Sequence, residues 1–211
     1  MAQEGRIYGG RSEQERRSDR RHRLLAAGLE LFGTEGWSGA TIERLCHVAG
    51  VATRSFYEEF SSREALLLAV YEDVMGELVT GVLPRLAATT GTDEQRLRAG
   101  ISGYVDYLTQ DPRRARVVHR EIRAAGVLEP ERQRMLLRFA DLIVREMHLG
   151  DLAGVAERRV LALALAGAVT EVLVDWVAQP EPRSQTGPIV ETLVRVFVAV
   201  VNSTPVDAHP G

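Results

Sequence analysis

Residues 53–57, with the sequence TRSFY, carry side chains that suit contacts to a nucleic acid. An arginine such as Arg54 can donate two hydrogen bonds to a guanine, and the threonine and serine beside it can bond to any base. Phe56 interrupts this polar run and is repeated at Phe60, which is the spacing of one helical face. We therefore expect a short helix with both phenylalanines inward. The side chains that we expect on its exposed face are those of Thr53, Arg54, Ser55 and Tyr57.

A second short helix must brace the first. Residues 42–49 repeat apolar side chains at i, i+3, i+4 and i+7, with Thr41 as the N-cap and Gly50 as the terminating residue. Only two residues separate this helix from the one at 53. Two short helices joined by a tight glycine-containing turn are the geometry of a helix-turn-helix, which places its second helix in the major groove of DNA.

The remaining residues predict an all-α fold of about nine helices, because no strand-like alternation occurs. A first helix covers about 18–33, and a fourth starts behind Ser61 and Ser62 and ends at Pro84. Caps place the next three helices, and a polar loop at 179–187 separates the last two. The expected ranges of these last five are 97–108, 111–125, 129–150, 155–178 and 188–202.

The charge of the chain is unevenly distributed. Its 211 residues carry a net charge of −3, yet residues 1–23 hold seven arginines against four carboxylates, which gives +3. We expect residues 1–17 to form a flexible basic arm and residues 204–211 a tail. Two interpretations of the arm stay open. It is a solvated tail, or it contacts phosphates or the minor groove through Arg16, Arg17, Arg20 and Arg21.

Several classes of function find no support in the sequence. The single cysteine, Cys46, forms no disulfide and belongs to no metal-ligand pattern, which favours a cytoplasmic protein without metal or cofactor. The apolar stretch 160–178 is long enough for a membrane span, but Glu171 and Asp175 favour a buried helix and no membrane. The histidines are scattered and no catalytic motif is present, so we do not expect an enzyme.

The N-terminal motifs resemble the TetR family of bacterial regulators. The match rests on Leu31-Phe32, Gly36, Thr41-Ile42, Ala49-Gly50-Val51, Phe56-Tyr57, Phe60 and residues 63–67, about a quarter of the chain. The resemblance implies a helix-turn-helix domain at 18–66. It also implies an all-helical domain at 67–203 for ligand binding and dimerisation.

The resemblance assigns roles to six residues. It implies that Thr41, Tyr57 and Arg63 contact the DNA backbone, and that Thr53, Arg54 and Ser55 lie near bases. Two residues depart from the family pattern. Ala52 stands where a capping serine or threonine is usual, and Glu59 stands where a histidine is common. A carboxylate there would repel a phosphate, so we expect no phosphate contact by Glu59.

The last two helices are apolar nearly all round, although a helix at the edge of a monomer needs only one apolar stripe. A homodimer with a four-helix interface would bury the excess apolar surface of these helices. It would also present two recognition helices to a palindromic operator of double-stranded DNA. The alternative is that both helices are central to a single core. The paired carboxylates Glu171 and Asp175 suit a cationic ligand, a partner such as Arg195, or solvent.

Large side chains with polar tips on the middle helices suit a mainly apolar pocket for a small-molecule effector, although each also suits an ordinary core. The candidates are Tyr71, Tyr104, Tyr107, His119, Met135, Phe139 and Trp176. Together these features predict a ligand-responsive repressor released from its operator by a small apolar molecule. The alternatives are an all-helical ligand-binding bundle or enzyme, and a protein adaptor.

Overall fold

The structure, a computed structural model, describes residues 12–126, 128–146, 155–180 and 185–203, and every regular element among these residues is a helix. Counting the continuous run from α7 to α8 as one, they form the nine expected helices and the one-turn helix α2. In chain order the elements are α1 (Glu13–Thr34), α2 (Gly36–Gly39), α3 (Ile42–Ala49), α4 (Thr53–Glu59), α5 (Arg63–Ala88), α6 (Asp93–Gln110), α7 (Pro112–Arg116), the π-helical turn η1 (Val117–Glu121), α8 (Ile122–Ala124), α9 (Glu129–Glu146), α10 (Val155–Ala178) and α11 (Gly187–Ser203). The predicted all-α class is confirmed.

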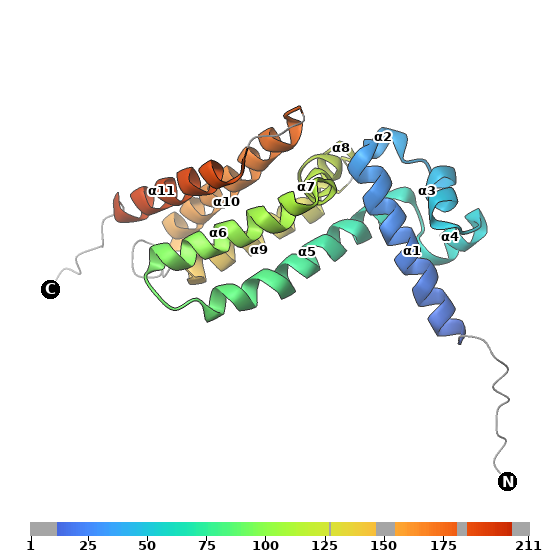
Figure 1. Cartoon of the computed structure of the whole chain (residues 1–211), viewed down its shortest axis with the longest axis horizontal. Coiled ribbons are helices and arrows are strands. Elements are labelled where there is room, and N and C mark those ends of the chain that lie inside the picture. Colours follow the sequence, from blue (N-terminus) through green and yellow to red (C-terminus); the bar gives the residue numbers. More distant parts are fainter. Residues whose placement is uncertain (1–11, 127, 147–154, 181–184, 204–211) are drawn as a thin grey trace, which may run out of the picture.

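Figure 1 shows two groups of helices. Helices α1–α4 gather at one end of the molecule, and α6–α11 form a bundle at the other. Helix α5 runs from the first group into the second, and α1 packs on α3, α5 and α7. The predicted boundary at residues 66 and 67 falls inside α5, whose first turns therefore serve both groups.

Helix α1 begins earlier than expected, at Glu13 instead of about residue 18. The reason is a capping box, in which the Ser12 hydroxyl accepts a hydrogen bond from the Glu15 backbone N–H and the Glu15 carboxylate accepts one from the Ser12 N–H. The prediction of a flexible arm is therefore wrong for residues 12–17. Residues 1–11 and the tail at 204–211 lie outside the described part.

The predicted turn between the two short helices is confirmed. The Thr41 hydroxyl accepts a hydrogen bond from the Arg44 N–H at 3.4 Å and caps α3. Gly50 ends α3 in the left-handed conformation (φ 63°), which glycine adopts without steric cost. Ala52 gives α4 no side-chain cap, as its methyl group dictates.

The core of the N-terminal group is built from apolar side chains of several elements. Phe32, Leu45 and Phe56 are fully buried. Gly28 lets α5 approach α1 closely, because a Cβ atom at this glycine would lie only 2.7 Å from Cγ2 of Val70. This packing fixes α3 and α4 on a rigid support.

The bundle also follows the predicted caps, with two exceptions. Thr92 with Gln95 caps α6, and Asp111 caps α7. The helix at 63 continues through Pro84 to Ala88, so the predicted end at Pro84 is wrong. A proline costs a helix one backbone hydrogen bond. Packing of α5 on α6 offsets that local cost. The π-helical turn η1 was not predicted.

Helix α10 is unusually apolar for its degree of burial. Residues 158–178 have a mean hydropathy of 1.9 and the length of a membrane span, yet only 33% of the most apolar window is buried. The helix packs against α9, α7, η1 and α11. Its remaining apolar surface, which includes Val160 at 67% exposed, has no cover among the described residues.

Candidate nucleic-acid interface and inner polar cluster

The outer face of α4 carries the polar side chains that the sequence predicted. The Arg54 side chain is 93% exposed, and its Nε lies 3.6 Å from Oε1 of Glu58 one turn later. Tyr57 is 56% exposed on the same face. Thr53 is exposed and Ser55 is half-buried. Thr53, Arg54 and Tyr57 are thus exposed together on α4. Figure 1 shows that this helix lies at the end of the molecule.

Buried aromatic rings hold this face outward. Phe56 lies in the core, with its ring centroid 5.4 Å from that of Tyr57 and 6.0 Å from that of Phe60. The Tyr57 ring packs edge-on against Phe56, an arrangement that stabilises aromatic pairs. The two inward phenylalanines therefore set the rotation of α4.

The two predicted backbone-binding residues outside α4 differ in their surroundings. Thr41 is exposed at the start of α3. Arg63 is half-buried, and its Nη1 donates to the backbone oxygens of Trp37 and Ala40 at 3.1 and 3.3 Å. Its guanidinium also stacks on the Trp37 ring at 3.7 Å. Arg63 therefore joins α5 to α2, a structural role that the sequence did not reveal.

Two further charged residues hold the helix-turn-helix in place and were missed from the sequence. Arg23 of α1 donates to the backbone oxygens of Ala49 and Gly50 at 2.9 and 3.0 Å, where α3 ends. Glu59 at the end of α4 accepts hydrogen bonds from Arg17 and Arg20 of α1. Both contacts join segments far apart in the sequence, so no local pattern announces them.

Cys46 lies between the two short helices and is buried. Burial raises the pKa of its thiol, and the neighbouring Thr53 hydroxyl acts in the opposite direction. The thiol therefore stays protonated at neutral pH and serves the core as a small apolar side chain.

The structure brings four of the predicted pocket residues together inside the bundle. Tyr104 Oη lies 3.4 Å from Nε2 of His119, and the Tyr104 ring packs edge-on against Phe139 with centroids 5.4 Å apart. Tyr71 is buried beside Tyr104, and burial raises its pKa to about 12. Burial, and secondarily the charge of Arg123, lowers the pKa of His119 to about 3, so its imidazole is neutral at physiological pH.

The other three predicted pocket residues have different surroundings. Tyr107 Oη donates to Glu77 at 2.8 Å and also lies 3.1 Å from the backbone oxygen of Val74, on the outer side where α5 meets α6. Met135 is half-buried one helical turn before Phe139, and Trp176 is buried in the core. Their roles in binding a ligand stay predictions.

A buried carboxylate joins the two groups of helices. Glu121, on η1, accepts a hydrogen bond from the Trp37 backbone N–H at 2.6 Å, and its side chain is only 4% exposed. Arg116 Nε donates to the same carboxylate at 2.9 Å, while its Nη1 donates to the Thr34 backbone oxygen at 2.8 Å. Since His119 lies two residues before Glu121, the same turn contacts Tyr104 inside the bundle and Trp37 at the base of the helix-turn-helix.

The carboxylates of α10 have ordinary partners. Glu171 pairs with Arg123 at 2.5 Å, and Asp175 accepts a hydrogen bond from Gln179 at 3.2 Å. The alternative partner suggested for this pair, Arg195, donates instead to Thr192. Neither carboxylate needs a cationic ligand.

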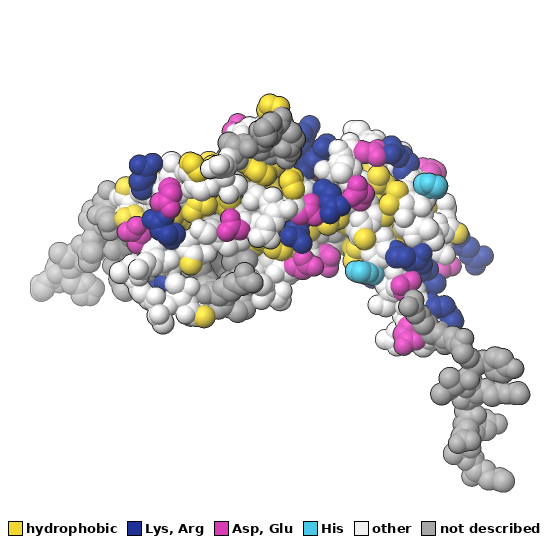
Figure 2. Space-filling view, in the orientation of Figure 1, with side chains coloured by type: hydrophobic (Ala, Val, Ile, Leu, Met, Phe, Trp, Pro, Cys, Tyr) yellow, Lys and Arg dark blue, Asp and Glu magenta, His cyan; other side chains and the backbone are white. Residues whose placement is uncertain are grey.

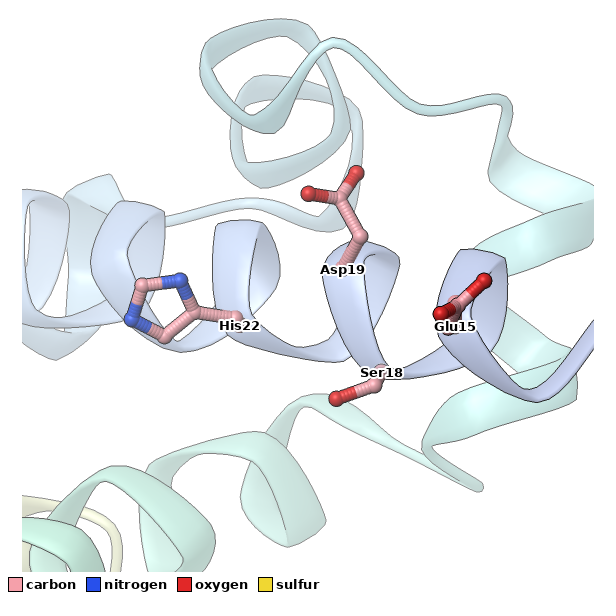
Figure 3. A pocket seen from close by; sticks show the side chains of 4 residues that line it. All are labelled: Glu15, Ser18, Asp19 and His22. Carbon is pink, nitrogen blue, oxygen red and sulfur yellow. The ribbon is translucent and has the colours of Figure 1, made fainter. Parts of the chain in front are cut away.

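A shallow surface hollow lies along α1 (Figure 3). Glu15, Ser18, Asp19 and His22 line it, and their side chains point in different directions. In the described part of the chain no three histidine, cysteine or acidic side chains come together as a metal site. This hollow has no feature of a ligand site.

Comparison with known proteins matches the N-terminal helices to one family. Residues 24–70 match the model described as bacterial regulatory proteins, tetR family. The transcriptional activator FasR of Mycolicibacterium smegmatis is 35% identical over 117 residues, which cover 54% of this chain and 53% of FasR. The transcriptional regulator BetI of Escherichia coli K12 is 38% identical over 90 residues, 42% of this chain and 46% of BetI. The chain thus spans about half the length of the curated relatives it matches.

Solved structures share the whole fold. The fatty acid degradation regulator FadR from Bacillus halodurans superposes with a TM-score of 0.73 at 19% identity, covering 85% of this chain and 94% of FadR. FadR from Bacillus subtilis, solved in complex with stearoyl-CoA, superposes with a TM-score of 0.71 at 17% identity. The superposition covers 84% of this chain and 97% of that FadR. The likeness therefore extends beyond the N-terminal match into the bundle.

Proposed function

We propose that the chain is a DNA-binding transcription regulator of the TetR family that acts in the cytoplasm, and the match of residues 24–70 to the model of that family supports this. We infer that it acts as a homodimeric repressor, which leaves a palindromic operator when a small, mainly apolar molecule enters the bundle. The observation that carries the proposal is the face of α4, where Arg54 and Tyr57 project from a helix fixed by buried Phe56.

The proposed DNA contacts follow from exposure and chemistry. Arg54 is the principal base-reading residue, because an exposed guanidinium on the second helix can form a bidentate pair with guanine. Arg63 keeps a proposed backbone role through the guanidinium nitrogens other than Nη1. The proposed base contacts are Thr53, Arg54 and Ser55, and the proposed backbone contacts are Thr41, Tyr57 and Arg63.

The proposed dimer uses α10 and α11. Val160 and Ala164 are exposed one turn apart on α10, and Val196 is exposed on α11. A second copy of the chain would cover these side chains by a four-helix contact. Twofold symmetry would then present the two α4 helices to half-sites about 34 to 36 Å apart.

The proposed effector binds in the bundle, where neutral His119, buried Tyr71 and half-buried Tyr104 supply hydrogen-bonding groups among apolar side chains. This composition suits a mainly apolar ligand with few polar groups. The Bacillus subtilis FadR structure, which shares this fold, holds stearoyl-CoA, whose acyl chain is long and apolar and whose coenzyme A part is charged. The proposed lining is Tyr71, Tyr104, Tyr107, His119, Met135, Phe139 and Trp176.

The proposed signal reaches DNA through α5 and η1. An effector that displaces His119 would move the turn that also carries Glu121, and with it the hydrogen bond to the Trp37 N–H. Helix α5 packs on both α1 and η1 and would move with them. Release of DNA requires that the effector bind the DNA-incompetent state more tightly than the competent one.

The decisive experiment selects bound fragments from the genome of the source organism and then titrates the recovered operator. We expect Arg54→Ala to reduce discrimination between operator and mixed-sequence DNA by about 1 to 3 kcal/mol and to leave the dimer intact. Arg138→Ala, which removes one exposed arginine from α9, is the matched control.

Other outcomes would change the proposal. A chain that binds no duplex even at low salt would be a ligand-binding bundle, an enzyme or an adaptor. An operator whose gene loses expression when the protein is deleted would indicate an activator, the activity named for FasR. Unchanged affinity of Arg54→Ala for every duplex would remove Arg54 from the interface.

A further inference from the structure

The start of α1 carries a group of arginines that contact the end of α4. The Glu59 side chain is only 1% exposed, yet its two carboxylate oxygens lie 3.2 Å from Arg17 Nε and 3.1 Å from Arg20 Nη2. Arg20 also lies 3.7 Å from Glu58, and Arg21 stacks on the Phe60 ring at 4.6 Å. Three exposed or half-exposed arginines of α1 thus adjoin the last turn of α4.

Local structure explains why these arginines share a face. The capping box at Ser12 starts α1 early, so Arg17 and Arg20 are fixed in a helix at spacing i, i+3, which places them side by side. Figure 1 shows that this part of α1 projects past α4, away from the bundle. In Figure 2 basic side chains gather over the same end of the molecule.

The charge balance of the group favours an anionic partner. Arg17, Arg20 and Arg21 lie beside two carboxylates, those of Glu58 and Glu59, and Arg17 remains 65% exposed. A guanidinium has five N–H donors, and the pair with Glu59 occupies only one on each arginine, although Nε of Arg20 is buried and cannot reach a partner outside the protein. The remaining donors are held in place by the ion pair, which reduces the entropy lost when a further partner binds.

We propose that Arg17 and Arg20 form a phosphate-binding site for the DNA backbone beside the bases that α4 contacts, and that Glu59 is its positioning residue. This inference rests on the proposed function, because it extends the same DNA interface from α4 onto α1. It keeps the expectation that Glu59 itself contacts no phosphate, but it replaces repulsion by a positioning role. The carboxylate does not face a phosphate as a repelling group, because both of its oxygens are bound to arginines that lie between it and solvent.

The experiment measures binding of the full-length dimer to a labelled mixed-sequence duplex over a series of salt concentrations. Each phosphate contact contributes about 0.9 to the slope of log affinity against log salt. Arg17→Ala and Arg20→Ala should each reduce the magnitude of that slope by about 1, whereas Arg138→Ala should leave it unchanged. Arg17→Lys keeps the charge and should restore most of the slope.

Glu59→Gln gives the sharper test, because the two interpretations predict opposite signs. If Glu59 positions the arginines, its neutralisation should weaken binding and reduce the slope, although it removes a negative charge near DNA. If Glu59 acts only as a nearby charge, the variant should bind more tightly. Equal or tighter binding therefore overturns the role of Glu59.

The failures of the two proposals are distinguishable. A wild-type dimer that binds the duplex while both alanine variants keep its salt slope overturns the arginine site alone. A wild-type dimer that binds no duplex at low salt overturns the proposed function as well. Circular dichroism on each variant verifies that α1 and α4 remain folded. If Arg17→Ala or Arg20→Ala loses helix, the corresponding arginine-to-glutamine variant takes its place.

Discussion

The two ends of the molecule place their polar side chains in opposite ways. Helix α4 buries Phe56 and exposes Arg54 and Tyr57, so its polar groups are available to a large partner outside the protein. The bundle instead buries Tyr71 and His119 among apolar side chains. A surface of the first kind suits a duplex, and an interior of the second kind suits a small molecule. Between them, Glu121 makes a direct hydrogen bond from one end to the other.

The largest test of this contrast concerns the exposed apolar side of the bundle. Val160→Glu places a charge where we propose that a second copy packs, and should convert the dimer to monomer. Loss of the linked half-site should weaken operator binding by about 100- to 10,000-fold. Val79→Glu, at another exposed valine on α5, should change neither property. Sedimentation and operator titration measure both; a monomeric wild-type protein would contradict the proposed interface.

An intermediate effect is expected from the buried histidine. The pKa of His119 falls from 6.5 to about 3 on folding, so between these values the unfolded chain binds the extra proton. The contribution of His119 to the free energy of unfolding should therefore be complete above pH 6.5. It should fall as the pH decreases below that value, by at most about 1.4 kcal/mol per pH unit.

Urea unfolding of the wild type and of His119→Gln over this pH range measures that dependence. The glutamine variant lacks the titrating group, so the difference in unfolding free energy between the two proteins should change with the predicted sign. Parallel pH profiles would show that His119 is not held neutral inside the bundle.

The smallest effect concerns the uncapped recognition helix. Ala52→Ser supplies a hydroxyl that can accept a hydrogen bond from a backbone N–H of the first turn of α4, and should stabilise the protein by about 1 kcal/mol. Ala52→Val offers no acceptor and should give no such gain. Chemical denaturation followed by circular dichroism compares the two; equal stability would mean that the first-turn N–H groups of α4 do not need a side-chain acceptor.

Interactions between residues close in sequence made much of the N-terminal helix group predictable. Thr41, Gly50 and the paired phenylalanines each act within a few residues of their own position, so a single sequence suffices to place α3 and α4. The same local logic failed at Pro84, because packing of α5 on α6 is a tertiary effect that outweighs a proline. It also missed the Ser12 capping box, because the first turns of α1 are polar and show no apolar repeat.

The site residues that the sequence analysis did not find all depend on partners far away in the sequence. Glu59 contacts arginines about forty positions earlier, and Glu121 contacts Trp37 eighty-four positions earlier. Neither residue belongs to a short motif. The sequence identified the polar side chains that α4 exposes, whereas the charged residues that hold α4 in place became visible only with the fold.

The π-helical turn makes the number of residues between α7 and α8 as important as their identity. At η1 the Ile122 N–H donates to the Val117 backbone oxygen, one residue further back than in an α-helix. Removing one residue there would restore the ordinary repeat and rotate the following segment by about 100°. His119 and Glu121 could then no longer meet their partners together, so this stretch should tolerate substitutions far better than deletions.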